Sequence, residues 1–106
     1  MPELKKYKMF IDGEWVDSES KKTFETLNPE NNEPWAVAPE ASAKDVDRAV
    51  KAAQKAFEGE WPKLLPRDRA KFLRAIADQL RKNAEMLGEI ETIDTGKLFR
   101  ETKQQA

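Results

Sequence analysis

The chain has 106 residues, and its 19 Lys and Arg residues nearly balance its 20 Asp and Glu residues. A chain of this length forms at most one domain, since it can bury roughly two-thirds of the surface that it exposes when unfolded. The balanced charge excludes a general attraction to nucleic acid or to an anionic membrane. No apolar run approaches the ~20 residues of a membrane-spanning helix, so we expect a cytoplasmic protein without nucleic-acid or membrane partners.

The sequence contains no cysteine and no histidine. These are the residues most often used for nucleophilic attack, for proton transfer near neutral pH and for binding transition metals. Their absence excludes disulfides and thiolate zinc sites. We therefore expect no complete active site within these residues.

The first predicted element is a β-hairpin around Asp12-Gly13. This dipeptide lies between the β-prone segments Met9-Phe10-Ile11 and Trp15-Val16. An Asp-Gly pair in such a setting is the strongest short-range signal for a type I′ turn, in which both central residues have positive φ. The alternative, a metal-binding acid beside a flexible residue, lacks a second acid at a suitable spacing. We expect strands near residues 8–11 and 14–17.

Two further strands are predicted before residue 40. Residues 23–27 alternate with period two and stop at Asn28-Pro29, a dipeptide that favours a turn. Residues 35–38 lie between Pro34 and Pro39. Because proline lacks the backbone donor of a strand ladder, this segment is predicted to be a short edge strand.

The first helix is predicted to begin after Ser42. The Ser42 hydroxyl can accept a hydrogen bond from the amide three residues on, where Asp45 supplies the acid of a capping box. Gly59 is predicted to end the helix as a left-handed cap. Between these ends, small and apolar residues recur on one face, which allows a neighbouring element to approach closely: Val46, Ala49, Val50, Ala53 and Phe57.

A second helix is predicted to start at Pro66, because the first helical position needs no amide donor. Asn83 is a poor helix former and predicts a break near residues 82–84, after which the apolar pattern resumes. Gly96 is predicted to cap this third helix after Thr95, and residues 98–106 carry the pattern of a further helix. The second helix has one apolar face, Ala70, Leu73, Ile76, Ala77 and Leu80, and an opposite charged face, Arg67, Arg69, Lys71, Arg74, Asp78, Arg81 and Lys82.

Three segments together carry a family resemblance: Phe10-Ile11-Asp12-Gly13-Glu14-Trp15-Val16, Phe24-Glu25-Thr26-Leu27-Asn28-Pro29 and Glu91-Thr92-Ile93-Asp94-Thr95-Gly96-Lys97. In this order and spacing, they closely resemble the N-terminal portion of the NAD(P)-dependent aldehyde dehydrogenase superfamily, and the resemblance covers residues 8–106. Gly96-Lys97-Leu98 followed by Arg100-Glu101-Thr102 is most similar to bacterial branches related to betaine-aldehyde and medium-chain aldehyde dehydrogenases.

The resemblance implies an α/β fold, or α+β when this segment is taken alone. Residues 1–106 would form the N-terminal part of a Rossmann-like cofactor-binding domain, with the hairpin and strands in residues 8–38 and helices in residues 42–106. Members of the superfamily are much longer oligomeric chains. Their catalytic region and their oligomerisation region are both absent from this sequence.

The resemblance also implies a chemistry. In the family, a cysteine thiolate attacks the aldehyde, a hydride passes to NAD or NADP, and a glutamate activates the water that releases the carboxylic acid. An asparagine amide and the backbone amide of the cysteine stabilise the oxyanion. All these residues, and those that bind the cofactor, would lie beyond Ala106. We therefore assign no catalytic or cofactor-binding residue to this chain and expect no cofactor bound by it alone.

One site of the family maps partly onto this sequence. Members similar to it hold a structural K⁺ or Na⁺ ion between a backbone carbonyl before the Asn-Pro turn and the aspartate of the Asp-Thr-Gly-Lys segment. The matching positions are Leu27 and Asp94, and a further ligand would come from outside the sequence. In the alternative interpretation, Asp94 only accepts hydrogen bonds from the turn at Gly96.

Other polar groups fit ordinary roles. Glu89 and Glu91 are two positions apart on a predicted helix and point in different directions, so they do not form a carboxylate pair for acid–base catalysis. The four glycines form no phosphate-binding pattern. The basic residues near 5–8 and on the face from 67 to 82 indicate solvated surfaces, since acids interrupt the second group.

We therefore expect the N-terminal segment of an aldehyde dehydrogenase that is catalytically incompetent alone and whose partner is the remainder of that fold. The alternative is a helical interaction module, derived from that segment, that self-associates through its apolar helix faces. The unfinished apolar pattern of residues 98–106 favours the first interpretation. A third possibility, an enzyme that uses only carboxylates and lysines, is not supported, because the sequence shows no pair of such residues suited to catalysis.

Overall fold

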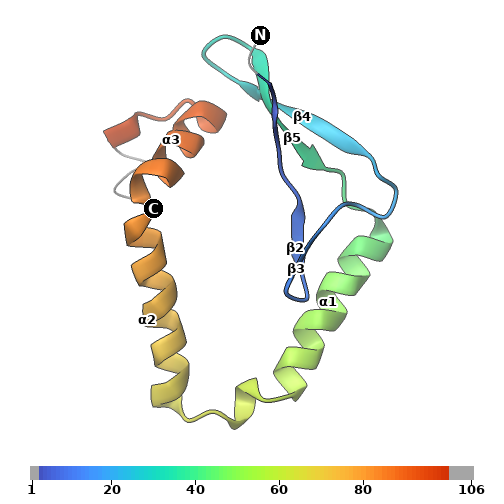
Figure 1. Cartoon of the computed structure of the whole chain (residues 1–106), viewed down its shortest axis with the longest axis vertical. Helices are drawn as coiled ribbons and strands as arrows, with labels where there is room; N and C mark the ends of the chain where they lie inside the picture. Colours follow the sequence, from blue (N-terminus) through green and yellow to red (C-terminus); the bar gives the residue numbers. More distant parts are fainter. Residues whose placement is uncertain (1–2, 101–106) are drawn as a thin grey trace. The chain divides into compact units, whose positions relative to one another are not determined.

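The computed structural model of the chain describes residues 3–100. It contains two compact units, one made of residues 1–26 and 34–63 and the other of residues 27–33 and 64–106. Strands come first along the chain and helices follow (Figure 1). This order confirms the predicted α+β class for the segment.

Three strands form a sheet in the order β1-β5-β4. They are β1 (Lys5–Lys6), β4 (Thr23–Asn28) and β5 (Glu33–Pro39). Strand β1 was not predicted, since its two lysines are not β-prone, and it pairs in parallel with β5. The Tyr7 amide extends this pairing by donating to the Val37 carbonyl at 3.0 Å.

The prediction that residues 35–38 form an edge strand is wrong, because β5 is the middle strand of this sheet. Pro34 and Pro39 lie at or next to its ends, so the residues between them keep their amides for pairing. Ala36, halfway along, is 1% exposed and is the only buried hydrophobic residue among residues 3–100. The sheet therefore provides the small apolar core of the segment.

The predicted hairpin is confirmed as β2 (Met9–Ile11) and β3 (Glu14–Val16), which pair antiparallel. Asp12 and Gly13 have φ values of 52° and 80°, both positive as a type I′ turn requires. This confirms the turn interpretation of the Asp-Gly dipeptide.

Helix α1 (Ala43–Glu58) begins with the predicted capping box: the Ser42 hydroxyl accepts from the Asp45 amide, and the Asp45 carboxylate accepts from the Ser42 amide. The predicted left-handed cap at Gly59 is wrong, since its φ is −94°. After a turn at residues 59–60, the chain continues into the short 3₁₀ helix η1 (Trp61–Lys63).

Helices α2 (Pro66–Lys82) and α3 (Ala84–Thr95) confirm the predicted start at Pro66 and the break at Asn83. Gly96 caps α3 in the left-handed region with a φ of 77°, and its amide donates to the Thr92 carbonyl at 2.8 Å. Residues 99–100 are helical, and the rest of the further helix predicted there lies outside the described residues. No helix within residues 3–100 is long and apolar enough to span a membrane.

Candidate functional site

The predicted cation site lies in the second unit, where the Asn-Pro turn meets the end of α3. A groove of about 520 Å³ separates these two segments, and its lining comes from both of them: Asn28, Pro29, Glu30, Thr92, Ile93, Thr95 and Gly96. A Cβ atom added at Gly96 would lie 3.1 Å from Cγ of Pro29. Glycine is thus needed at position 96 both for its positive φ and for the close approach of Pro29.

The structure brings together the two segments that hold the predicted ligands. Leu27 precedes the turn in β4, and Asp94 lies in the last turn of α3; both residues are exposed, and their chain neighbours line the groove. The last turn of a helix carries partial negative charge on its carbonyls, which favours a cation there. Coordination by the Leu27 carbonyl and the Asp94 carboxylate stays a prediction.

Local hydrogen bonds shape both sides of this groove. The Asn28 side-chain oxygen accepts from the Glu30 amide at 3.0 Å, which closes the turn. On α3, the Thr95 hydroxyl donates to the Glu91 carbonyl at 2.7 Å, and the Lys97 ammonium lies 3.6 Å from the Glu91 carboxylate. Glu91 is therefore part of an ion pair on the surface of the second unit.

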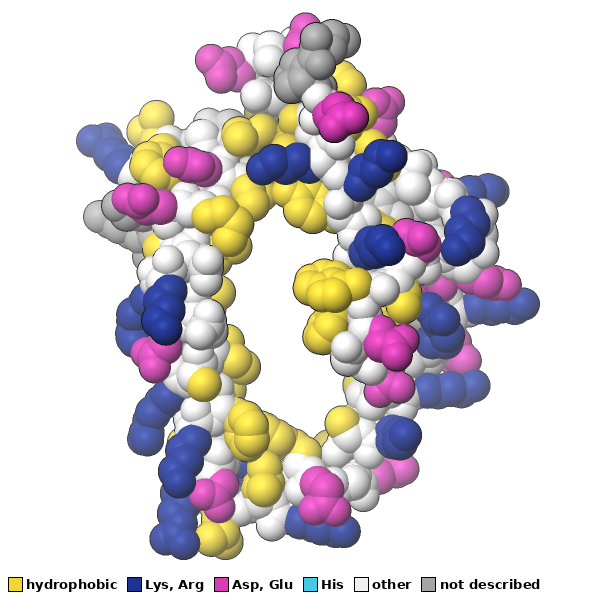
Figure 2. All heavy atoms as spheres, in the orientation of Figure 1, with side chains coloured by type: hydrophobic (Ala, Val, Ile, Leu, Met, Phe, Trp, Pro, Cys, Tyr) yellow, Lys and Arg dark blue, Asp and Glu magenta, His cyan; other side chains and the backbone are white. Residues whose placement is uncertain are grey.

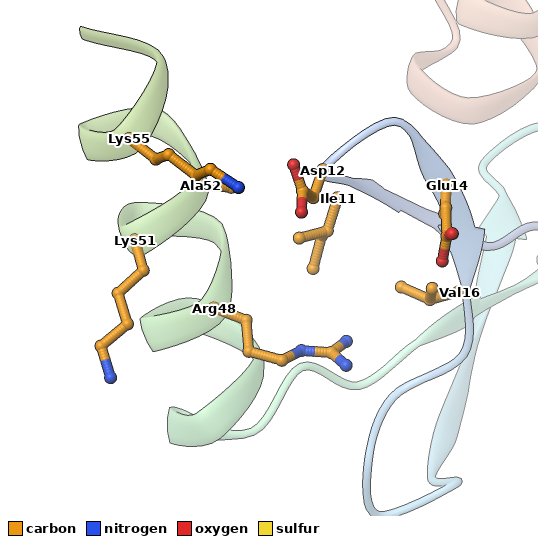
Figure 3. A pocket seen from close by; sticks show the side chains of 8 residues that line it. All are labelled: Ile11, Asp12, Glu14, Val16, Arg48, Lys51, Ala52 and Lys55. Carbon is orange, nitrogen blue, oxygen red and sulfur yellow. The ribbon is translucent and has the colours of Figure 1, made fainter. Parts of the chain in front are cut away.

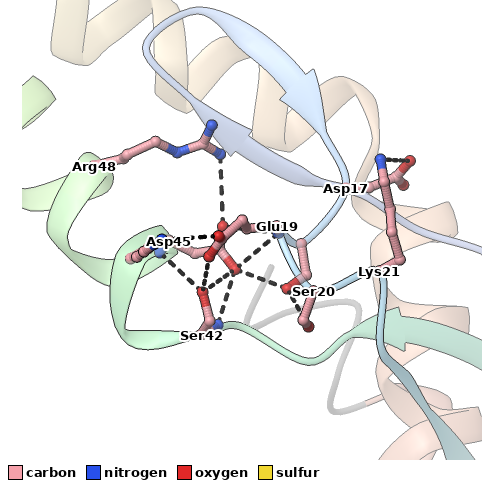
Figure 4. Close-up of polar contacts among 9 residues, drawn as sticks. Asp17, Glu19, Ser20, Lys21, Ser42, Asp45 and Arg48 are labelled. Carbon is pink, nitrogen blue, oxygen red and sulfur yellow. Dashed lines mark hydrogen bonds and ion pairs between the residues drawn. The ribbon is translucent and has the colours of Figure 1, made fainter.

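Sequence reasoning missed the main polar cluster of the first unit, which surrounds Asp45 (Figure 4). Asp45 and Ser18 are each 1% exposed. One carboxylate oxygen of Asp45, Oδ2, accepts from the Ser18 hydroxyl at 2.8 Å and from the Ser42 amide at 2.8 Å. The other oxygen, Oδ1, accepts from the Glu19 amide at 3.1 Å and lies 3.7 Å from the Arg48 guanidinium. We call this group the Asp45 cluster.

The hydrogen bonds of the Asp45 cluster hold the pKa of Asp45 well below its ordinary 3.8, chiefly that from the Ser42 amide and then that from the Ser18 hydroxyl, against the opposing effect of burial. Both carboxylate oxygens are already engaged. The cluster therefore joins the loop of residues 17–20 to the start of α1 and is not available for proton transfer to a substrate.

A second groove, of about 330 Å³, lies between the hairpin and α1 and has charges of both signs (Figure 3). Arg48 extends toward the hairpin, whereas Lys51 extends away from it. Arg48 is paired with Asp45 at 3.7 Å, and the Lys51 ammonium with the Asp47 carboxylate at 2.9 Å. Lys55 of α1 and the acids Asp12 and Glu14 of the hairpin line the same groove, so it does not concentrate charge of one sign.

Comparison with known proteins identifies the family. The sequence model described as the aldehyde dehydrogenase family matches residues 15–106. The chain belongs to this family. An aldehyde dehydrogenase of Aspergillus niger is 49% identical over 89 residues, which are 84% of this chain and 18% of that protein. The matched residues are about one fifth of that relative's length, and the predicted resemblance to the aldehyde dehydrogenase superfamily is confirmed.

Solved structures agree with the sequence match. An NAD-dependent aldehyde dehydrogenase from Sinorhizobium meliloti superposes with a TM-score of 0.92 at 35% identity, covering 96% of this chain and 21% of that one. A betaine aldehyde dehydrogenase from Staphylococcus aureus in complex with NAD⁺ gives a TM-score of 0.87 at 42% identity, covering 92% of this chain and 20% of that one. The segment thus has the fold of the N-terminal part of these enzymes.

Proposed function

We propose that this chain is a scaffold segment of a cytoplasmic NAD(P)-dependent aldehyde dehydrogenase, an oligomeric enzyme that oxidises aldehydes to carboxylic acids. The observation that supports this most is the exposure of its apolar helix faces. On α1, Val50 is 61% and Phe57 68% exposed, while Ala36 is the only buried hydrophobic residue within residues 3–100. Surfaces of this kind need a covering partner. In the proposal, that partner is the rest of the same enzyme.

The proposal divides the chemistry between this segment and the rest of the enzyme. NAD or NADP, bound by the rest of the enzyme, would accept the hydride from the substrate. Within residues 3–100, Gly13 lies in a hairpin turn, and Gly59 and Gly96 lie at helix ends, so these glycines do not form a phosphate-binding loop before a helix. The part of the chain that the structure describes also contains no group of three or more acids that could hold a metal ion. In the proposal, this segment forms part of the cofactor-binding domain and supplies no residue to the chemistry.

We further propose that the parent belongs to the bacterial branch related to betaine aldehyde dehydrogenases. Support comes from the Staphylococcus aureus betaine aldehyde dehydrogenase, with 42% identity and a TM-score of 0.87. The sequence Gly96-Lys97-Leu98 with Arg100-Glu101-Thr102 supports the same branch. Betaine aldehyde is accordingly the first substrate to test.

A chimaeric enzyme tests the proposed function. In it, this chain replaces the matching segment of the Staphylococcus aureus betaine aldehyde dehydrogenase. We expect the chimaeric enzyme to reduce NAD⁺ with betaine aldehyde, and the same host without the segment to show no activity. A chimaeric enzyme that is folded but inactive, or turnover by the purified 106-residue chain alone, would contradict the proposal.

Light scattering of the purified chain tests the alternative of a self-associating module. The scaffold proposal predicts a partly unfolded or aggregating chain, because its apolar faces lack their partner. A discrete symmetric oligomer would instead favour the interaction module.

The proposed K⁺ or Na⁺ site at Leu27 and Asp94 is tested on crystals of the chimaeric enzyme soaked in rubidium, a heavier analogue of potassium. Leu27 would contribute only its backbone carbonyl, so Asp94→Asn is the variant that weakens the site while keeping its shape. We expect anomalous density between the two residues, reduced in Asp94→Asn. A soaked crystal without this density would reject the site.

A further inference from the structure

The groove of about 330 Å³ between the hairpin and α1 has the size of a small-molecule site. We call it the hairpin groove. Both of its walls are regular secondary structure of the first unit. The apolar part of its lining is half-buried and comes from both walls, with Ile11 and Val16 on the hairpin and Ala52 on α1.

The two walls of the hairpin groove carry opposite charges. Asp12 and Glu14 supply carboxylates on the hairpin, whereas Arg48 and Lys55 extend from α1 toward it (Figure 3). Lys51 extends away and is paired within its own helix. Asp12, Glu14 and Lys55 form no ion pair with any other of residues 3–100. The acids of one wall and the bases of the other therefore do not neutralise one another directly.

Arg48 is the charged group of the hairpin groove that the structure positions most firmly. Its Nη2 atom lies 3.7 Å from Oδ1 of Asp45, which is 1% exposed and accepts hydrogen bonds from Ser18 and Glu19. A guanidinium has several N–H donors, so this pair orients the side chain and leaves donors for a ligand. The Arg48 side chain is 53% exposed, so a ligand can reach it from solvent.

The distribution of charge selects the kind of ligand. Figure 2 shows acidic and basic side chains intermixed over α1, so an extended polyanion would meet acids as well as bases. In the hairpin groove, a ligand with a single charge would be attracted by one wall and repelled by the other. A ligand with opposite charges at its two ends meets both walls favourably, and methylene groups between those ends can cover the apolar lining.

We propose that the hairpin groove binds a small ω-amino acid, in which an aliphatic chain separates a carboxylate from an ammonium group. Arg48 and Lys55 donate to the carboxylate, and Asp12 and Glu14 accept from the ammonium group. All four protein groups are exposed, so solvent screening keeps the affinity low, on the order of millimolar. The site uses only residues of this chain and takes no part in the proposed aldehyde oxidation.

Hydrogen exchange in the folded chimaeric enzyme tests the proposal, with 6-aminohexanoate as the ligand. Hexanoate and hexylammonium, each with one of the two charges, are the controls at equal ionic strength. Peptides that cover residues 9–16 report on the hairpin wall. We expect saturating 6-aminohexanoate to slow their exchange about threefold or more, because a ligand that bridges the walls opposes local opening of the hairpin. The two controls should leave their exchange unchanged.

Variants of the two walls locate the binding site. Lys55→Gln removes a base from α1, and Glu14→Gln removes an acid from the hairpin. Each should raise the dissociation constant of 6-aminohexanoate, read from the same peptides, by about fivefold. Lys51→Gln is the matched control, because Lys51 extends away from the hairpin, and it should leave the dissociation constant unchanged.

The outcomes that would overturn the proposal are distinct from failure of the proposed function. Absence of slowing by 6-aminohexanoate, or equal slowing by a control with one charge, would reject an ω-amino acid as the ligand. A dissociation constant that is unchanged in both Lys55→Gln and Glu14→Gln would reject the hairpin groove as its site. Because the measurement reports binding, a folded enzyme without aldehyde turnover would contradict only the proposed function.

Discussion

The two units of this chain are stabilised in different ways. In the first unit, Asp45 joins a loop to α1 through hydrogen bonds made within the unit. In the second unit, Pro29 packs on Gly96 at one place, while an apolar groove at the junction of α2 and α3, lined by Phe72, Ile76 and Leu80 among others, stays open at another. Within residues 3–100, every buried side-chain nitrogen and oxygen has a hydrogen-bond partner. The buried polar groups of the described residues therefore all have partners, whereas many of their large hydrophobic side chains are not covered.

This difference follows from the costs of leaving each kind of group without a partner. An unsatisfied polar group that is buried destabilises any structure that contains it, so polar clusters must be completed locally. Apolar surface can stay in water until another part of the protein covers it. The first unit should therefore respond most to loss of a hydrogen bond, and the second to changes in packing.

Loss of the Asp45 carboxylate should have the largest effect. Asp45→Ala leaves the Ser18 hydroxyl and the Ser42 and Glu19 amides without their acceptor. Hydrogen exchange of peptides containing these amides, measured in the chimaeric enzyme, should accelerate by on the order of 100-fold. Asp47, an exposed acid two residues further along α1, provides the control. Asp47→Ala should leave the exchange rates of the same peptides unchanged. Equal acceleration in both variants would show that the Asp45 cluster does not hold the loop.

The same carboxylate should give a pH dependence of defined sign. Its pKa is lowered in the folded state, so the stability that it contributes is present above its ordinary pKa of 3.8 and is lost as the pH falls toward the folded value. The difference in exchange protection between the wild-type protein and Asp45→Asn should stay constant from about pH 7 to 5 and shrink below about pH 4. A difference that grows with acidification would contradict this assignment.

Packing in the second unit is probed at Gly96. Gly96→Ala should lower the free energy of local opening of the end of α3 by about 1–3 kcal/mol, since it adds strain at positive φ and a contact with Pro29. Gly13→Ala is the matched control, because Gly13 also has positive φ but a Cβ there meets nothing within 4 Å. Hydrogen exchange should show the larger effect at Gly96, and a Pro29→Ala background should reduce it to that of Gly13→Ala. Equal effects of Gly96→Ala and Gly13→Ala in the wild-type background would show that the contact with Pro29 does not contribute.

The smallest effect is expected for an exposed ion pair. Lys51 pairs with Asp47 at 2.9 Å on the surface of α1, and this hydrogen bond raises the pKa of Lys51. Solvent screening makes such pairs contribute little. Lys51→Ala should leave the melting temperature of the chimaeric enzyme unchanged, and a measurable decrease would show that the first unit depends on its surface charges as well as on Asp45.

The sequence predicted those parts of the fold that depend on neighbours in the chain. The Asp12-Gly13 turn, the Ser42 capping box, the helix start at Pro66 and the cap at Gly96 each rest on residues a few positions apart. The central position of β5 and the pairing of β1 depend on strands that are distant in sequence, and the pattern of residues 35–38 carried no information on them. Local patterns likewise could not distinguish the two backbone conformations open to Gly59.

The same distinction, between contacts of sequence neighbours and contacts of distant residues, applies to the candidate sites. Asp45 was predicted as the acid of the capping box, but its hydrogen bond from Ser18 joins residues 27 positions apart and has no local signature. Phe72 was left out of the predicted apolar face of α2, yet it lines an apolar groove at the junction of α2 and α3 together with Ile76 and Leu80 of that face. The proximity of the Asn-Pro turn to the end of α3 was reached only through the family resemblance.

The hairpin tip has a consequence for chemical synthesis. Asp12 and Gly13 both adopt positive φ, and space is open around Gly13. Mirror-image amino acids prefer the backbone region that ordinary residues avoid. D-Alanine should therefore fit at position 13, where L-alanine is strained. Two variants of identical composition, differing only in the chirality of this one residue, should thus differ in the rigidity of the hairpin tip.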